Sequence, residues 1–226
     1  MKTAKLMSYV MLAALVGLLM GCGENPTKNL DDSVVTDAVE EPASTEAEPA
    51  GEAPAMITYT IDPAESNITF GGSKTIAGVN VGTHYGGWTE YDGTVTVPED
   101  GNLENAKIEL LIDMTSLYSD DSDLTTNLVK AEGLFQIDQF PESTFTSTGI
   151  KKTEKGYDVS GNLTLRGVKK NIVFPAKITM EDGQIIAEAE FALDRQSFNM
   201  DFVNQAGDYV VDDKVAVTFY AVAKAG

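Results

Sequence analysis

Few side chains in this sequence could carry nucleophilic or general-base catalysis. The 226 residues include one histidine, His84, and one cysteine, Cys22. A serine or cysteine nucleophile normally needs a nearby base, most often histidine, and a histidine-and-cysteine zinc site needs more of both residues. We therefore interpret His84 as a hydrogen-bonded loop residue. The sequence predicts a protein that is not an enzyme and that uses no metal ion or cofactor.

Carboxylates are the one abundant group that could do chemistry. The chain has 35 acidic residues against 16 basic ones, and its formal net charge is −19. A hydrolase with two paired carboxylates stays open, because the sequence does not give their separation in space. The acidic cluster at residues 119–123 lacks the glycine and the terminal glutamate of an EF-hand loop, which favours a helix start over a calcium site. So acidic a surface opposes nucleic acid and anionic lipid headgroups.

The first residues are typical of an exported protein. Two lysines, Lys2 and Lys5, precede an uncharged and mostly apolar run at residues 6–20. This is the pattern of a secretory signal peptide, and the run is shorter than the roughly 20 apolar residues of a membrane-spanning helix. We therefore predict a signal peptide at residues 1–21.

The cysteine that follows predicts a lipid anchor. Residues 19–22, Leu-Met-Gly-Cys, are similar to a lipobox, where diacylglycerol is attached to the cysteine sulfur and the chain is cleaved before it. Cys22 is thus the predicted lipid attachment site, and two or more acyl chains anchor a protein stably to a membrane. We expect a lipid-anchored protein of the periplasm or cell envelope. Gly23, in place of the aspartate that retains some lipoproteins at the inner membrane, favours the outer membrane.

Composition divides the rest of the chain into a tether and one domain. Residues 23–55 contain no aromatic residue, and nine acidic residues there stand against Lys28 alone. Such a segment buries too little apolar surface to offset the entropy of ordering. We therefore predict a disordered acidic tether at 22–55, carrying the lipidated Cys22, and a single domain at 56–226.

Alternating apolar and polar residues predict strands through most of this domain. The period of two is clear at residues 106–112, 171–180 and 185–193, and turn signals stand at 166–167 and 181–183. One helix is expected within residues 120–134, with Ser122 or Asp123 as its cap. Many short antiparallel strands with one short helix favour an all-β, antiparallel, eight-stranded, lipocalin-like barrel, because closure removes exposed edges. The interior of such a barrel is either filled by side chains or holds one small ligand.

Three segments carry a resemblance to a known family. Residues 58–64, Thr-Tyr-Thr-Ile-Asp-Pro-Ala, match its opening strand, and residues 138–148 are similar to its FDxxxYPxxxFxST stretch. Most specific are residues 161–170, GNLTLRGVKK, which are close to the family hairpin GxLTLRGVTKP. On these motifs the domain resembles the YceI-like family, described as polyisoprenoid-binding, lipocalin-like proteins of the bacterial periplasm.

The resemblance implies a non-enzymatic carrier that holds an isoprenoid or similar amphiphilic lipid, with the apolar tail inside the barrel and the polar head near its mouth. Homodimers are a further expectation. The tentative ligand contacts are an apolar lining and three polar residues near the mouth: Ile68, Phe70, Phe145, Leu163, Leu165, Phe174, Phe191 and Phe219, with Lys74, His84 and Arg195. Two alternatives stay open, namely an envelope interaction or stress module with a solid barrel, and the carboxylate-based hydrolase.

Overall fold

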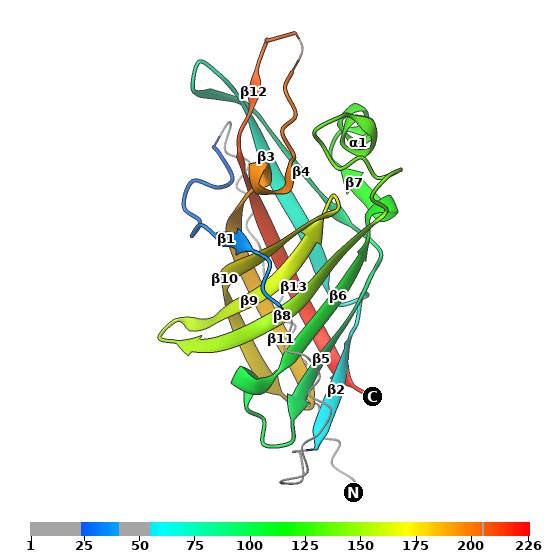
Figure 1. Cartoon of the computed structure of the whole chain (residues 1–226), viewed down its shortest axis with the longest axis vertical. Coiled ribbons are helices and arrows are strands. Elements are labelled where there is room, and N and C mark those ends of the chain that lie inside the picture. Colours follow the sequence, from blue (N-terminus) through cyan, green and yellow to red (C-terminus); the bar gives the residue numbers. More distant parts are fainter. Residues whose placement is uncertain (1–23, 41–54, 205) are drawn as a thin grey trace, which may run out of the picture.

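The computed structural model describes residues 24–40, 55–204 and 206–226. Eight antiparallel strands close into a barrel in the order β2-β5-β6-β8-β9-β10-β11-β13 and back to β2 (Figure 1). Their bounds are β2 Met56–Ile61, β5 Tyr91–Pro98, β6 Lys107–Asp113, β8 Glu142–Thr153, β9 Gly156–Leu165, β10 Val168–Glu181, β11 Gln184–Asp194 and β13 Lys214–Ala225. The predicted eight-stranded antiparallel barrel is confirmed.

Local sequence explains why these segments form neighbouring strands. In β10, Ile172, Phe174 and Ala176 are buried while Lys177 and Thr179 are exposed, as the alternating pattern predicts. The turns on either side of β10 have two successive residues at positive φ: Arg166 and Gly167 before it, Asp182 and Gly183 after it. Such turns match the twist of antiparallel strands and set the register of both hairpins.

A second group of strands extends the barrel wall at one end. The first part of β13 pairs with β3 (Asn67–Ile76), and its last residues pair with β2. β3 forms a hairpin with β4 (Val79–Trp88), and the short strands β7 (Leu117–Ser119) and β12 (Val210–Val211) pair with β4 and β3. Figure 1 shows this hairpin, β7 and helix α1 together at the upper end of the molecule. We call it the α1 end.

Helix α1 spans Ser122–Lys130, within the predicted range, but its cap is not Ser122 or Asp123 as predicted. Its cap is Asp121, whose side chain accepts hydrogen bonds from the backbone N–H groups of Asp123 and Leu124 at 2.8 and 2.9 Å. The described residues also form three short 3-10 turns, at Leu103–Asn105, Met114–Ser116 and Arg195–Phe198. None of the helices in the described residues is long and apolar enough to cross a membrane.

The barrel is packed solid at the end opposite α1. Val97, Ile150 and Ile185 are buried there, and Leu103 of the first 3-10 turn covers them from β5 and β8. Side-chain packing of this kind leaves no room for a ligand. Any ligand site inside the barrel must therefore lie between this packed layer and the α1 end.

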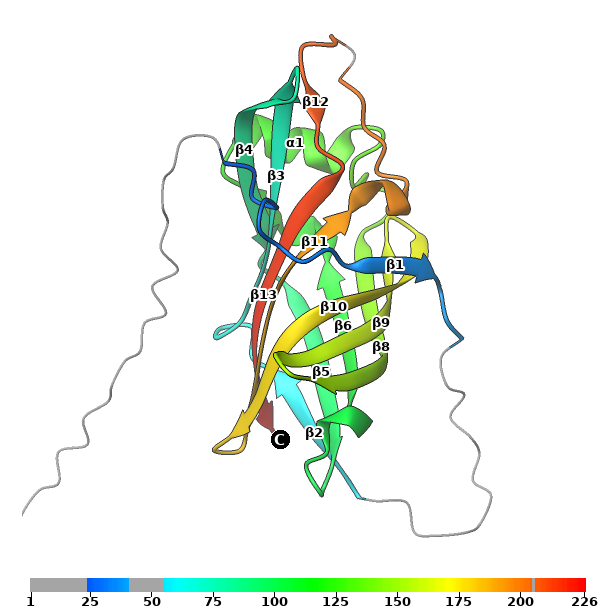
Figure 2. The same ribbon diagram turned by 90° about the vertical axis from the view of Figure 1, so that its left-hand side faces the viewer.

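The segment at 24–40 differs from the predicted tether. Strand β1 (Val34–Asp37) pairs with residues 170–173 of β10, and Asp32 forms a bridge with Ala192 of β11. Direct pairing between β10 and β11 covers only Lys177–Glu181 with Gln184–Glu188, so this segment spans the place where the two strands separate (Figure 2). We call residues 31–39 the strap. The prediction of disorder is wrong here, while residues 41–54, the signal peptide and Cys22 lie outside the described residues.

Specific contacts explain why so polar a segment folds onto the barrel. Val35 packs against the core, and the buried amide of Asn162 exchanges two hydrogen bonds with the Val39 backbone, 3.1 Å to its N–H and 2.8 Å to its carbonyl. Ser33 donates its N–H to the Ala192 carbonyl at 2.8 Å. The local composition of residues 24–40 does not predict these contacts, because their partners lie more than 120 residues away along the chain.

Candidate ligand-binding cavity

The lower part of the barrel interior holds an apolar cavity of about 170 Å³. Its wall comes from the inward faces of the barrel strands and from β3. Four phenylalanines form the densest part: Phe174 stacks on Phe191 with ring centroids 4.6 Å apart and lies 5.8 and 6.1 Å from Phe145 and Phe219. This lining can bind an apolar chain and offers almost nothing for hydrogen bonding.

A second cavity of about 290 Å³ lies toward the α1 end. It is bounded by the β3–β4 hairpin, helix α1 and residues 199–215. Its inner wall is apolar, with Leu128, Phe135 and Phe202 among the lining residues, and its outer part carries the polar side chains. Those polar residues are Ser73, Lys74, His84, Asp121, Asp123, Asn127 and Arg195.

The two cavities adjoin and share part of their lining. Trp88, Leu165, Leu193 and Val217 line both of them. The Trp88 ring packs 5.3 Å from Phe70 and 5.7 Å from Phe135, centroid to centroid, and its Nε1 is buried without a hydrogen-bond partner in the described part of the chain. We call the two adjoining cavities together the channel: it is apolar in its depth and polar at one mouth, the arrangement that an amphiphile requires.

All eleven residues that the sequence singled out lie along this channel. The lower cavity is lined by Ile68, Phe145, Leu163, Phe174, Phe191 and Phe219, the upper one by Phe70, Lys74, His84 and Arg195, and both by Leu165. Their contact with a ligand stays a prediction.

Sequence reasoning did not include the junction residues Trp88, Leu193 and Val217. The strand register would have found Trp88, because it is the partner of Ile68 across β3 and β4, and directly opposite residues share a face.

Arg195 is held by backbone carbonyls and not poised for a headgroup. Its side chain is 4% exposed, and its guanidinium donates to the carbonyls of Met200, Val211 and Asp212 and to the Asp213 carboxylate at 3.4 Å. Burial lowers the pKa of Arg195, and the nearby carboxylate of Asp213 opposes that shift. These four contacts tie Met200 to the end of β12 and the two residues after it, so we interpret Arg195 as a support for the cavity wall.

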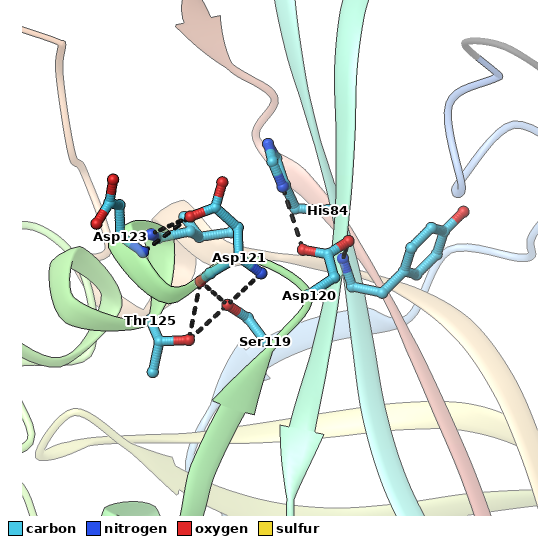
Figure 3. A network of polar contacts seen from close by, with 8 residues as sticks. His84, Ser119, Asp120, Asp121, Asp123 and Thr125 are labelled. Atoms are coloured by element: carbon cyan, nitrogen blue, oxygen red, sulfur yellow. Dashed lines mark hydrogen bonds and ion pairs between the residues drawn. The ribbon is translucent and has the colours of Figure 1, made fainter.

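His84 belongs to a polar network at the mouth (Figure 3). Its Nδ1 lies 3.2 Å from Oδ1 of Asp120, whose other oxygen accepts the Tyr85 backbone N–H at 3.0 Å. The next residue, Asp121, caps α1, and the backbone N–H of Leu124 is the main cause of its lowered pKa. The acidic cluster that could suggest calcium therefore pairs with His84 and starts the helix. Within the described residues no group of three or more potential metal ligands occurs.

Lys74 is the cation of the mouth that reaches the cavity from the β3–β4 hairpin. Its Nζ lies 5.2 Å from the centroid of the Tyr209 ring, a cation–π arrangement. Asp121 and Asp123 line the same cavity on the helix side. The mouth therefore presents one lysine opposite two carboxylates, which disfavours a multiply charged anionic headgroup.

A closed antiparallel β-barrel with an internal apolar cavity places the chain in the class of lipocalin-like barrels. More particularly, the chain belongs to the YceI-like domain family, which matches residues 59–223. Among curated proteins, UPF0312 proteins of Yersinia enterocolitica and Yersinia pestis are 37% and 34% identical to it over 95 residues, 42% of this chain and 48% of theirs. The chain spans about half the length of these relatives.

Two solved structures share the fold at low sequence identity. BcnA of Burkholderia cenocepacia has a TM-score of 0.60 and 19% identity, covering 72% of this chain and 98% of that one. A polyisoprenoid binding domain from Saccharophagus degradans, implicated in plant cell wall breakdown, has a TM-score of 0.57 and 19% identity, covering 75% and 99%. Both likenesses support the fold alone.

Proposed function

We propose that this protein binds one amphiphilic lipid with an isoprenoid or similar tail, without chemical turnover, in the cell envelope. The observation that carries the proposal is the pair of adjoining cavities, apolar in the barrel and polar at the α1 end. The tail lies among Phe145, Phe174 and Phe191, and the head lies near Lys74 and His84. A polyisoprenoid-binding relative of the same fold is consistent with such a tail.

Cys22 gives the proposed location. Lipidation there, after removal of residues 1–21, ties the barrel to a membrane surface in the periplasm, with the outer membrane favoured. A carrier of a water-insoluble lipid has reason to stay beside the bilayer that supplies it. We assign the barrel a storage or transfer role and no catalytic residue.

The direct test is to identify the guest. Protein purified from a bacterial membrane fraction is analysed by native mass spectrometry, and the bound material is then extracted and identified. We expect one apolar-tailed molecule per barrel. A protein that is empty after membrane extraction and does not take up long-chain amphiphiles in vitro would contradict the proposal.

A pair of variants ties the binding to the channel. Val217 lies at the junction of the two cavities, so V217F should narrow the passage and weaken binding of long-tailed ligands at least about tenfold. V34F is the matched control, because Val34 is 58% exposed on β1 and lines neither cavity. Trp88, the sole tryptophan, reports occupancy through its fluorescence. Equal affinities for the two variants would place the ligand elsewhere.

A further inference from the structure

The tip of the β3–β4 hairpin exposes apolar side chains to solvent. Ile76, Val79 and Val81 are 49, 65 and 53% exposed. Val210 of β12, the partner of Thr75 across the strands, is 67% exposed beside them. We call these four residues the apolar tip. Large aliphatic side chains grouped in this way at one end of a molecule mark a surface that something covers.

Charge sets this hairpin apart from the rest of the chain. Residues 66–89 contain no aspartate or glutamate, although the whole chain has 35 of them. The hairpin strands carry Lys74 and His84, and both of these line the upper cavity. The three hairpin residues of the tip can thus approach a lipid surface without bringing negative charge of their own strands, and the acidic residues that flank the fourth, Val210, are Asp208 and Asp212.

The N-terminal segment places this tip beside the proposed anchor. The Thr83 hydroxyl of β4 donates to the Glu24 carbonyl at 3.2 Å, and the Asn25 amide donates to Asp212 at 2.8 Å, just after β12. Cys22 is two residues from Glu24, so covalent geometry limits their Cα separation to about 7 Å. An acyl chain on Cys22 would therefore enter the bilayer close to the β3–β4 hairpin.

We propose that the apolar tip docks on the bilayer surface and holds the polar mouth of the channel against the membrane. This inference rests on the proposed anchoring at Cys22 and specifies the face of the barrel that the anchor presents. Four side chains on a protruding hairpin and its neighbour are too few for a stable dimer, which buries about 800 Å² and 20–30 residues per partner. Insertion into the interface requires only that the few residues be apolar.

Site-specific labelling in a Cys22→Ser background tests the docking. A polarity-sensitive fluorophore is placed at V79C, and V34C serves as the control, because both valines are highly exposed and Val34 lies on the strap. With phosphatidylcholine vesicles, we expect the emission at position 79 to shift to the blue and the emission at position 34 to stay unchanged. Equal responses at both positions, or none at position 79, would overturn the proposal. A concentration-dependent shift at position 79 without vesicles would also overturn it, in favour of self-association.

A charge substitution supplies the functional half of the test. The V79D/V81D double variant should lower the vesicle-bound fraction on the order of tenfold, while V34D leaves it unchanged. Ligand binding in detergent, followed by Trp88 fluorescence, should be the same in all three proteins. If the unmodified protein bound no ligand in detergent, the proposed function would be refuted. Retained ligand binding without vesicle contact would refute only the docking face.

Discussion

At the scale of single residues, glycines in the barrel wall leave the space that the large side chains lining the channel occupy. Gly161 of β9 shows this most clearly, because a Cβ there would lie 2.2 Å from the Phe145 ring and 2.8 Å from the Thr146 carbonyl oxygen. Phe145 in turn lines the lower cavity and packs on Phe174. The glycine in this motif is therefore required by the position of a cavity-lining ring.

Replacing Gly161 should disturb that ring. We expect G161A to lower the free energy of unfolding by about 1–3 kcal/mol through overpacking, and to weaken binding of a tail in the lower cavity. Urea unfolding and ligand titration followed by Trp88 fluorescence measure the two effects. G149A is the control, because nothing lies within 4 Å of a Cβ at Gly149 on the neighbouring strand. If G161A were as stable as the unmodified protein, the Phe145 ring would be able to move aside without loss of folding free energy.

A second contact at the residue scale predicts that the stability of the folded protein depends on pH. Lys224, at the end of β13, lies 2.6 Å from both Asp62 and Glu65 in the turn between β2 and β3. The hydrogen bond from Lys224, helped by the Ala64 N–H, lowers the pKa of Asp62 below its ordinary value of 3.8. Because the folded pKa is the lower one, the stabilisation is complete well above pH 3.8 and is lost as the pH falls through the folded pKa.

The D62N variant should therefore melt at a lower temperature than the unmodified protein at pH 7. The difference in Tm should shrink as the pH falls below about 4, because Asp62 of the unmodified protein is then protonated too. Thermal unfolding followed by circular dichroism between pH 7 and pH 2 measures this trend. D182N, in the exposed turn after β10, is the control. A Tm difference that persisted unchanged at pH 2 would show that charge is not the cause.

At the scale of elements, the strap completes a wall that the barrel strands alone leave incomplete. It pairs with β10 and bridges to β11 over the region where those two strands no longer pair with each other. Asn162, 1% exposed, holds its end through the Val39 backbone and also accepts a hydrogen bond from Asn171 at 3.2 Å. The strap is therefore part of the folded unit although its composition is that of a linker.

Removing the Asn162 amide should release the strap. We expect N162A to lower the free energy of unfolding by about 1–3 kcal/mol, because the Val39 backbone and the Asn171 amide lose their hydrogen bonds to the buried Asn162 side chain. Amide hydrogen exchange in residues 31–39 should accelerate more than exchange in β13. D37N is the control, because the Asp37–Lys170 ion pair is exposed and such pairs contribute little. If hydrogen exchange at residues 31–39 did not change, the strap would be held mainly by the packing of Val35 and the pairing of β1, and not by Asn162.

Local signals in the sequence predicted most elements, and distant pairings set the rest. Alternation and turn residues identified β6, β10 and β11. The family resemblance, and not the alternation, supplied Phe145, Phe174 and Phe191 as tentative ligand contacts. The strap was missed because Asn162 and Val173, which hold it, lie far along the chain. The junction residue Trp88 was missed because its place depends on the β3–β4 register, which no local pattern specifies.

At the scale of the whole molecule, the N-terminal segment limits how far the barrel could move from the proposed anchor at Cys22. A freely flexible tether of about 33 residues would let the barrel move on the order of 30 Å from its anchor. The docked residues 24–40 remove that freedom on the anchor side, because Glu24 and Asn25 are hydrogen-bonded to the barrel. The barrel should therefore sit in one orientation with its mouth toward the bilayer.

A Cys22→Ser variant should separate anchoring from binding. We expect most of it to move from the membrane fraction to the soluble fraction of the envelope, because the apolar tip alone binds a bilayer weakly and reversibly, while ligand affinity measured in detergent changes less than about twofold. Cell fractionation and mass spectrometry of the N-terminus check the two expectations, with S33T, a conservative change in the strap, carried through the same procedure. A variant that stays with the membrane would show that Cys22 is not the main attachment.

The strap also decides how far the folding unit extends beyond the family domain. The family match begins at residue 59, whereas ordered pairing begins near residue 31. A shortened chain that starts at Met56 would leave the backbone of residues 170–173 without its strand, and bare edges of this kind pair with other chains. Two full-length molecules could instead exchange their straps, so that the strap of each pairs with β10 of the other. A domain-swapped dimer would then be held together by contacts already present in the monomer, without any new interface.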